Sequence, residues 1–189
     1  MRKLILLASI LLLAACDKAD EKYSTVYPVN FHFDMSLHVG TYLSSIVENA
    51  NYFVIVSREY QTGKQRLTVT PNDGNSVQTI DITTDREQYL LRQMGSDNRL
   101  IIGCLFGVFD VNDNVYSYIA YDGQCRFCLD TYNMNRFPLT FTHDGHSVEC
   151  ANCHRQYSLN TGASTDGYLL YTYKAQYDDG TKVLTVTNR

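Results

Sequence analysis

The chain has 189 residues, with 16 basic and 20 acidic side chains and a formal net charge of −4. This acidic balance argues against nucleic acid as a partner and against electrostatic docking on a membrane surface. The length suits a single domain. Fifteen tyrosines, no tryptophan and abundant valine, threonine and isoleucine favour an all-β fold.

The first fifteen residues have the form of an export signal. Arg2 and Lys3 supply a positive start, and 4–13 is an almost unbroken apolar run. That run is shorter than the roughly 20 residues that a membrane-spanning helix needs. It ends in LAAC at 13–16, which resembles the lipobox of bacterial lipoproteins. The resemblance implies cleavage before Cys16 and acylation of Cys16; an ordinary secretory signal that happens to contain a cysteine is the alternative.

The export signal and the lipobox divide the chain into three expected segments. We expect a signal peptide at 1–15, a lipidated tether at 16–26 and one β domain at 27–189. Residues 17–22 are charged and free of aromatics, as expected for a flexible tether. Several acyl chains on one residue suffice for stable anchoring. The sequence thus predicts a lipid-anchored protein of the bacterial cell envelope, in the outer rather than the inner membrane, and names no protein partner.

The domain begins with a clear strand pattern. From Val29 to Leu37, apolar residues alternate with polar ones, which predicts a half-buried strand with His32 and His38 on its solvated side. Thr84 and Glu87 have the spacing of a capping box, so one short helix is predicted near 85–94, ending before Gly95. Further strands are predicted over 52–60, 65–70, 77–82, 100–109, 115–121, 137–142, 155–159, 169–177 and 182–187.

Two C-x-x-C pairs stand in the second half of the chain, Cys125/Cys128 and Cys150/Cys153, with 21 residues between them. Each pair can place two sulfurs about 3.5–4 Å apart, the edge of a tetrahedron whose metal–sulfur bonds are about 2.3 Å long. Two such turns at the ends of neighbouring hairpins would complete a four-cysteine metal site, in a subdomain over about 120–162. A closed thiolate shell leaves no position for water or substrate, so the site would be structural or one-electron, not hydrolytic.

Other roles for these cysteines remain open. In an oxidising envelope the four thiols could form two disulfides that join one pair to the other. A dithiol exchange site of thioredoxin type belongs at a strand-to-helix junction, and the sequence predicts no helix after either pair. Cys104 lies alone in an apolar run, which predicts a buried free thiol.

The surroundings of the cysteines resemble a known family. The chain reads AYDGQC at 120–125, a strand and turn, and then VECANCHRQYSLNTG at 148–162. This pattern resembles the Rieske iron–sulfur domain, in which C-x-H and C-x-x-H loops are followed by an aromatic residue, a short strand and a T-G turn. Cys125 and Cys150 match the two loop cysteines, and Tyr157 matches the aromatic position. The ends of the domain also look like lipoproteins related to Rieske-like ferredoxins of the Bacteroidetes, which implies an antiparallel β-sandwich.

The ligand set departs from that family. Phe127 and Cys153 occupy the positions of the two loop histidines, which raise the potential of a Rieske cluster. His154 lies one residue too late and is expected to point away from the sulfurs. Cys128 and Cys153 therefore complete a rubredoxin- or zinc-ribbon-like set of four cysteines. We expect zinc; a [2Fe–2S] cluster or a single iron is the alternative. His143 and His146 could tune the site but are expected to be solvated turn residues.

No catalytic constellation is visible in the sequence. We therefore expect a non-catalytic module with a structural metal. The alternative is a ferredoxin-like electron-transfer protein. A role as a subunit of an oxygenase or reductase rests on analogy of fold alone, and would make the chain at most an electron-transfer component of an oxidoreductase.

Overall fold

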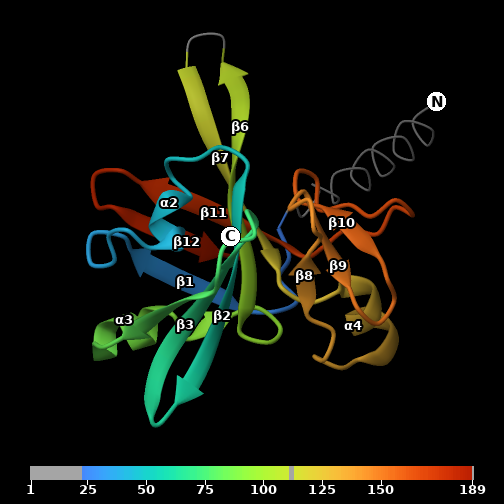
Figure 1. Cartoon of the computed structure of the whole chain (residues 1–189), viewed down its shortest axis with the longest axis horizontal. Helices are drawn as coiled ribbons and strands as arrows, with labels where there is room; N and C mark the ends of the chain where they lie inside the picture. The colour runs from blue at the N-terminus through green and yellow to red at the C-terminus, as the bar shows by residue number, and fades with distance from the viewer. Residues whose placement is uncertain (1–22, 111–112, 189) are drawn as a thin grey trace, which may run out of the picture.

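The computed structural model describes residues 23–110 and 113–188, with side chains described outside 106–116. The expected signal peptide at 1–15 and the lipidation site Cys16 lie outside the described residues. Within them the chain is mostly β, as predicted, with a curled antiparallel sheet, a smaller sheet and three short helices (Figure 1). No helix in this part of the chain combines the length and the apolar character needed to cross a membrane.

The described strands and helices have the following bounds. The strands are β1 (Val29–Asp34), β2 (Tyr52–Gln61), β3 (Lys64–Pro71), β4 (Gln78–Ile82), β5 (Gln93–Met94), β6 (Arg99–Asp110), β7 (Asp113–Asp122), β8 (Leu139–Phe141), β9 (Ser147–Cys150), β10 (Gln156–Ser158), β11 (Thr172–Asp178) and β12 (Val183–Thr187). The helices are α2 (Tyr42–Ser45), α3 (Asp85–Leu90) and α4 (Arg126–Tyr132).

Nine strands form one antiparallel sheet in the order β4-β3-β2-β6-β7-β11-β12-β1-β5. The first strand of the domain pairs with the last, so that Asn30 lies opposite Thr187 and Asp34 opposite Val183. A second sheet contains β10, β9 and β8. Together with α4 it forms a separate small layer beside β2, β6 and β7 (Figure 1).

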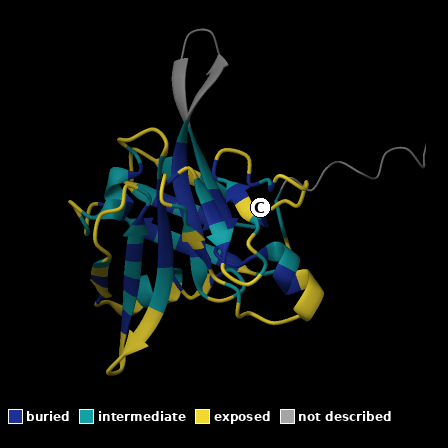
Figure 2. Ribbon diagram, turned by 45° about the vertical axis from the view of Figure 1, so that its right-hand side comes forward, coloured by how far each residue is buried: buried dark blue, intermediate teal, exposed yellow. Residues whose placement is uncertain are grey.

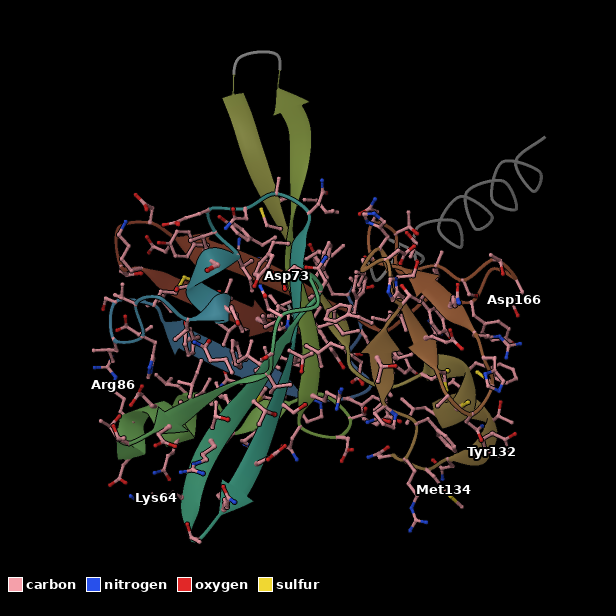
Figure 3. The ribbon with its side chains drawn as sticks, in the orientation of Figure 1. Lys64, Asp73, Arg86, Tyr132, Met134 and Asp166 are labelled. Carbon is pink, nitrogen blue, oxygen red and sulfur yellow. The ribbon has the colours of Figure 1, made fainter. Side chains whose placement is uncertain are left out.

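Two hydrophobic cores lie on opposite faces of the central strands. On β2, Val54 and Val56 point into the core inside the curled sheet, whereas Phe53 and Ile55 point into the core shared with the small sheet. A strand buried on both faces reads as a continuous apolar run, as β2 does. Buried residues accordingly follow the middle of the large sheet, and exposed ones gather at hairpin tips and loops (Figure 2). Lys64 and Arg86 mark the large-sheet side, and Tyr132 and Asp166 the small-sheet side (Figure 3).

Helix α3 begins as the sequence predicts but ends early. The hydroxyl of Thr84 accepts from the Glu87 amide at 3.2 Å, and the Glu87 carboxylate accepts from the Thr84 amide at 3.3 Å, a complete capping box. The helix ends at Leu90, and Gln93–Met94 forms a short strand on the free edge of β1. Burial of Met94 in the first core favours this pairing over continued helix.

The end of the first strand also differs from the prediction. Beyond Asp34 the chain turns, because the Asp34 carboxylate accepts from the Ser36 amide at 3.0 Å. Leu37 is therefore 62% exposed instead of buried. The prediction of a solvated His38 is wrong: its ring stacks on Phe33 with centroids 4.9 Å apart, and Nε2 lies 2.6 Å from the Glu87 carboxylate.

Candidate metal centre

The first cysteine loop leaves the large sheet after β7 and enters a helix. Cys125 is the N-cap residue of α4, and its carbonyl accepts from the Leu129 amide at 2.9 Å. The expectation that no helix follows either cysteine pair is therefore wrong. Cys125 has no capping side-chain bond, so the usual sequence signal for a helix start is missing. The setting still differs from a thioredoxin motif, because the strand after α4, β8, belongs to an antiparallel sheet.

The second loop is a tight turn between β9 and β10. The Cys150 carbonyl accepts from the His154 amide at 2.8 Å, and the Cys150 amide donates to the Arg155 carbonyl at 3.0 Å. His154 has a φ of 56°, in the left-handed region, which reverses the chain. Its side chain is 77% exposed and lies 3.4 Å from the Glu149 carboxylate. His154 thus points away from the sulfurs, as predicted.

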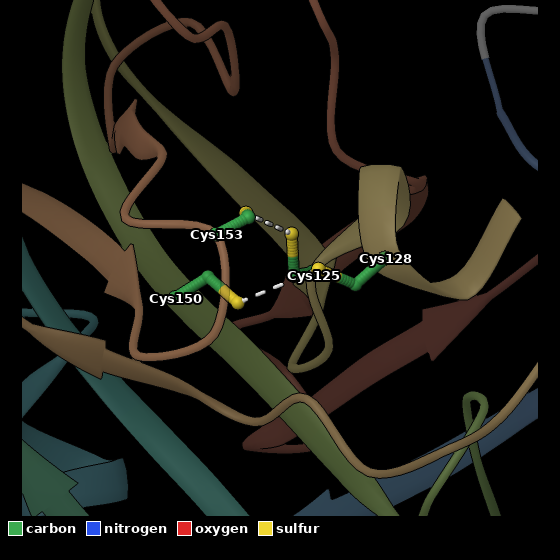
Figure 4. A group of neighbouring side chains, drawn as sticks. All are labelled: Cys125, Cys128, Cys150 and Cys153. Atoms are coloured by element: carbon green, nitrogen blue, oxygen red, sulfur yellow. Dashed lines mark hydrogen bonds between the residues drawn. The ribbon is translucent and has the colours of Figure 1, made fainter. Parts of the chain in front are cut away.

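The two loops bring all four sulfurs together. The four Sγ atoms lie within 4.8 Å of one another. Cys125 and Cys153 are 3.6 Å apart, and Cys128 and Cys150 are 3.8 Å apart, so both contacts join one loop to the other (Figure 4). A tetrahedral site with bonds of about 2.3 Å has sulfurs about 3.8 Å apart. All four cysteines are free thiols, and together they could bind a metal ion.

Three of the sulfurs are sealed from solvent. Cys125, Cys128 and Cys150 are fully buried, whereas Cys153 is half-buried. Burial raises the pKa of the Cys125 thiol, and it raises the pKa of Cys128 to about 11. A metal ion must displace these protons, because the thiolate is the ligand.

Cys153 has a different electrostatic environment. Burial opposes its ionisation, but the Arg155 amide and the sulfurs and guanidinium around it stabilise the thiolate and lower the pKa of Cys153 to about 7. The Arg155 guanidinium is held in place by stacking: it lies 3.4 Å from the ring centroid of Phe127 and 4.9 Å from that of Tyr168. Its Nε donates to the Asp166 carboxylate at 2.8 Å.

Two neutral side chains contact the buried sulfurs. The Tyr157 hydroxyl lies 3.3 Å from the Cys125 sulfur, and the Asn152 amide donates to the Cys128 sulfur at 3.4 Å. A metal-bound thiolate carries no proton, so Tyr157 must then be the donor. Burial raises the pKa of Tyr157, which keeps it a neutral donor. Sequence reasoning gave neither contact a role, although Asn152 lies inside the second pair.

A buried carboxylate fixes the start of the first loop. Asp122 accepts from the Ser96 amide and hydroxyl at 2.8 and 2.6 Å, from the Tyr173 hydroxyl at 2.8 Å and from the Gln124 amide at 2.9 Å. Burial raises the pKa of Asp122 despite these four donors. The Gln124 side chain in turn accepts from the Phe137 amide at 2.7 Å, which ties the loop to the segment before β8.

The remaining candidate residues lie outside the sulfur group. His143 and His146 are exposed and, with His154, none belongs to the group of potential ligands. Cys104 is fully buried in the other core, as predicted, and burial raises its pKa to about 11. The donor set is thus four thiolates, which suits zinc and iron better than hard cations.

No protein-family model, curated protein or solved structure matches this chain. The geometry of the cysteine cluster therefore carries the functional argument.

Proposed function

We propose that this protein is a lipid-anchored module of the bacterial envelope in which Cys125, Cys128, Cys150 and Cys153 hold one zinc ion in a structural, non-catalytic role. The observation that carries the proposal is the convergence of four thiols to within 4.8 Å, from the segment that follows β7 and from the turn between β9 and β10. Four-thiolate tetrahedral shells are typical of structural zinc, since no coordination position is left for a substrate.

The compactness of the cluster supports a single ion. A [2Fe–2S] centre divides its four thiolates between two irons, so some sulfur pairs must lie further apart than the edge of one tetrahedron. Here all four Sγ atoms lie within 4.8 Å of one another, and contacts at 3.6 and 3.8 Å join one loop to the other. One tetrahedral ion fits this arrangement. A single iron is the alternative to zinc, and visible absorbance distinguishes the two.

The order of elements supports a Rieske-like frame for this site. The first cysteine loop follows β7, a hairpin of β8 and β9 comes next, and the second loop joins β9 to β10. Both loops therefore flank one hairpin, as the resemblance of residues 120–162 implies. In this proposal the family's two histidines are replaced by Cys128 and Cys153.

A bound ion would stabilise the small layer strongly. Structural zinc sites contribute on the order of 10–16 kcal/mol at neutral pH, comparable with the roughly 5–15 kcal/mol stability of a whole domain. The site would thereby join α4 and the small sheet, whose own strands have only three or four residues each.

Metal content and visible absorbance test the metal. We expect the purified protein to be colourless, with one zinc per chain, and the double variant Cys125→Ser/Cys150→Ser to lose it. Cys104→Ser is the matched control, because it removes a buried thiol from the other core. Iron with or without sulfide, seen as colour, would instead establish the electron-transfer alternative. Two native disulfides among the four cysteines would contradict any metal role.

The anchor is tested separately. The sequence at 13–16 supports acylation of Cys16, and we expect Cys16→Ala to move the protein from the membrane fraction to the soluble fraction. Wild-type and variant proteins should bind equal amounts of metal. Membrane association that survives this substitution would show that the lipobox assignment is wrong.

A further inference from the structure

We propose that Cys153 is a modification site, the first of the four sulfurs to attack a disulfide-containing oxidant, and that the reaction passes to Cys125 and releases the metal. This inference rests on the proposed metal site. It concerns which cysteine is oxidised first and how the metal is released, and the number of ligands alone determines neither.

Accessibility singles out Cys153. Its three partner cysteines are fully buried, and it alone of the four is half-buried. An oxidant approaching from solvent therefore meets this sulfur before the others. Thiol–disulfide exchange depends on such access, as well as on the nucleophilicity of the attacking sulfur.

Arg155 lies beside that sulfur and is held there by two aromatic rings. The Arg155 guanidinium contacts the Cys153 sulfur and stacks on the rings of Phe127 and Tyr168. Phe127 belongs to α4 and the ring of Tyr168 meets it edge-on with centroids 5.0 Å apart. Asp166, at the outer margin of the small-sheet side (Figure 3), holds the guanidinium from outside. These contacts lie near the surface, so we expect Arg155 to slow the reaction of Cys153 with the oxidant without preventing it.

The second step has a partner in place. The Cys125 sulfur lies 3.6 Å from that of Cys153 (Figure 4). In the first step the Cys153 thiolate attacks the disulfide of the oxidant, forms a mixed disulfide and expels one thiolate. In the second step the Cys125 thiolate attacks the Cys153 sulfur and expels the other. Two cysteine thiolates are oxidised to one disulfide, and the oxidant is reduced by two electrons to two thiolates.

Loss of the metal follows from the ligand count. Once Cys125 and Cys153 are joined, only Cys128 and Cys150 remain as thiolates, too few for a closed tetrahedral shell. The new bond links the first loop to the second, as the metal did. The small sheet therefore stays tied to α4 after the ion has left.

The test uses the metal-loaded chain carrying Cys16→Ala, treated with the neutral reagent 4,4′-dithiodipyridine in the presence of a chromogenic zinc chelator. We expect metal release to follow modification and the first disulfide found by mass spectrometry to be Cys125–Cys153. Arg155→Gln should accelerate release about tenfold, the kinetic equivalent of one charge-assisted hydrogen bond. Arg126→Gln is the matched control, because Arg126 stacks on Tyr171 and pairs with Asp130 without contacting a sulfur.

The outcomes separate this inference from the function on which it rests. A first disulfide between any other two cysteines, or equal acceleration by Arg155→Gln and Arg126→Gln, would overturn the inference while the metal site stands. Purified protein without any metal would overturn the proposed function and this inference together. Arg155→Lys keeps the charge but loses the planar stack, and an intermediate release rate is expected for it.

Discussion

Tyr157 and Tyr121 bury their hydroxyl groups in the same core, but only one of them contacts a sulfur. Tyr157 lies 3.3 Å from the Cys125 sulfur, whereas the Tyr121 hydroxyl donates to the Leu159 carbonyl at 3.1 Å. Both side chains are almost completely buried. Comparing variants of the two tyrosines therefore distinguishes the contribution of a buried hydrogen bond to the fold from its contribution to the proposed metal site.

We expect Tyr157→Phe to weaken metal binding about fivefold, the equivalent of about 1 kcal/mol for one hydrogen bond. The hydroxyl no longer donates to the thiolate, while the ring still fills its place. Competition with a chelator measures the change. Tyr121→Phe should lower the free energy of unfolding by a similar amount and leave metal affinity unaltered. Equal losses of affinity in both variants would show that the hydroxyl of Tyr157 has no particular role at the sulfur.

The sequence predicted the four cysteines of the cluster better than the residues that surround them. The spacing of the two cysteine pairs was enough to propose the four thiols that the structure brings together. Arg155 and Asn152 were given no role, because their contacts depend on the turn at His154 and on the stacking of Arg155 over Phe127. These arrangements come from side-chain packing, which spacing along the chain does not encode.

At the scale of elements, α3 carries a pH-dependent contact. The Glu87 carboxylate completes the capping box of α3 and accepts from His38 at 2.6 Å. Burial opposes ionisation of Glu87, but the hydrogen bonds from His38 and Thr84 prevail and hold its pKa below the usual range. Folding therefore favours the carboxylate form.

The lowered pKa of Glu87 sets the direction in which stability changes with pH. Because the pKa of Glu87 is lower in the folded than in the unfolded state, its stabilisation is complete above the unfolded value of about 4.3 and is lost as pH falls through the folded value. We expect Glu87→Gln, which keeps an N3 acceptor, to flatten this acid-side loss. Urea unfolding between about pH 6 and about pH 3 measures it. Parallel pH profiles for wild type and variant would contradict the assignment.

A second element-scale contact joins the two sheets at a turn. Gly145, between β8 and β9, has a φ of +69° and packs against the Asn72 backbone so closely that a Cβ would clash with the Asn72 carbonyl oxygen. The Asn72 side chain donates to the Gly145 carbonyl at 3.0 Å and accepts from the Phe53 amide at 3.0 Å. Through Asn72, the turn of the small sheet is thus attached directly to β2.

We expect Gly145→Ala to destabilise the fold by about 2–3 kcal/mol or more, since it adds this clash to the roughly 1–2 kcal/mol cost of a left-handed residue. Gly63→Ala is the matched control: its φ is +77° and its surroundings are open. Only the left-handed cost should appear there. Thermal unfolding compares the two variants. Equal decreases in Tm would mean that the backbone at Asn72 moves away from the added Cβ without loss of stability.

Element prediction succeeded where apolar residues alternate and failed where tertiary contacts decide. The hairpin of β2 and β3 and the start of α3 follow from sequence patterns. Helix α4 did not, because Cys125 offers no capping bond; its left-handed stop at Asn133 was the available signal. The two-residue β5 was missed because it depends on the free edge of β1, far away in the sequence.

At the scale of the whole molecule, the two cores should respond differently to metal removal. The core inside the curled sheet contains none of the four cluster cysteines, whereas the second core contains Cys125, Cys128 and Cys150 among its buried residues. If the cluster holds an ion as proposed, its loss would remove the link between the two cysteine loops and leave buried thiols in its place. The large sheet retains its own apolar interior.

We therefore expect chelation to raise amide hydrogen exchange in β8, β9, β10 and α4, while β1, β11 and β12 stay protected. Hydrogen exchange followed by mass spectrometry resolves these segments, and the apo Cys125→Ser/Cys150→Ser variant should match chelated wild type. Uniform loss of protection across both sheets would show that the two cores unfold as one unit.

The pairing of β1 with β12 has a consequence for the order in which the molecule folds. Contacts such as Asn30 with Thr187 span nearly the entire domain, whereas the four cysteines lie within 125–153. Long-range strand pairing is slow, because chain entropy must be lost before the contacts form. A chain synthesised from its N-terminus therefore has all four cysteines available before β12 emerges. Strand β1 stays unpaired on that edge until the final residues arrive to close the sheet.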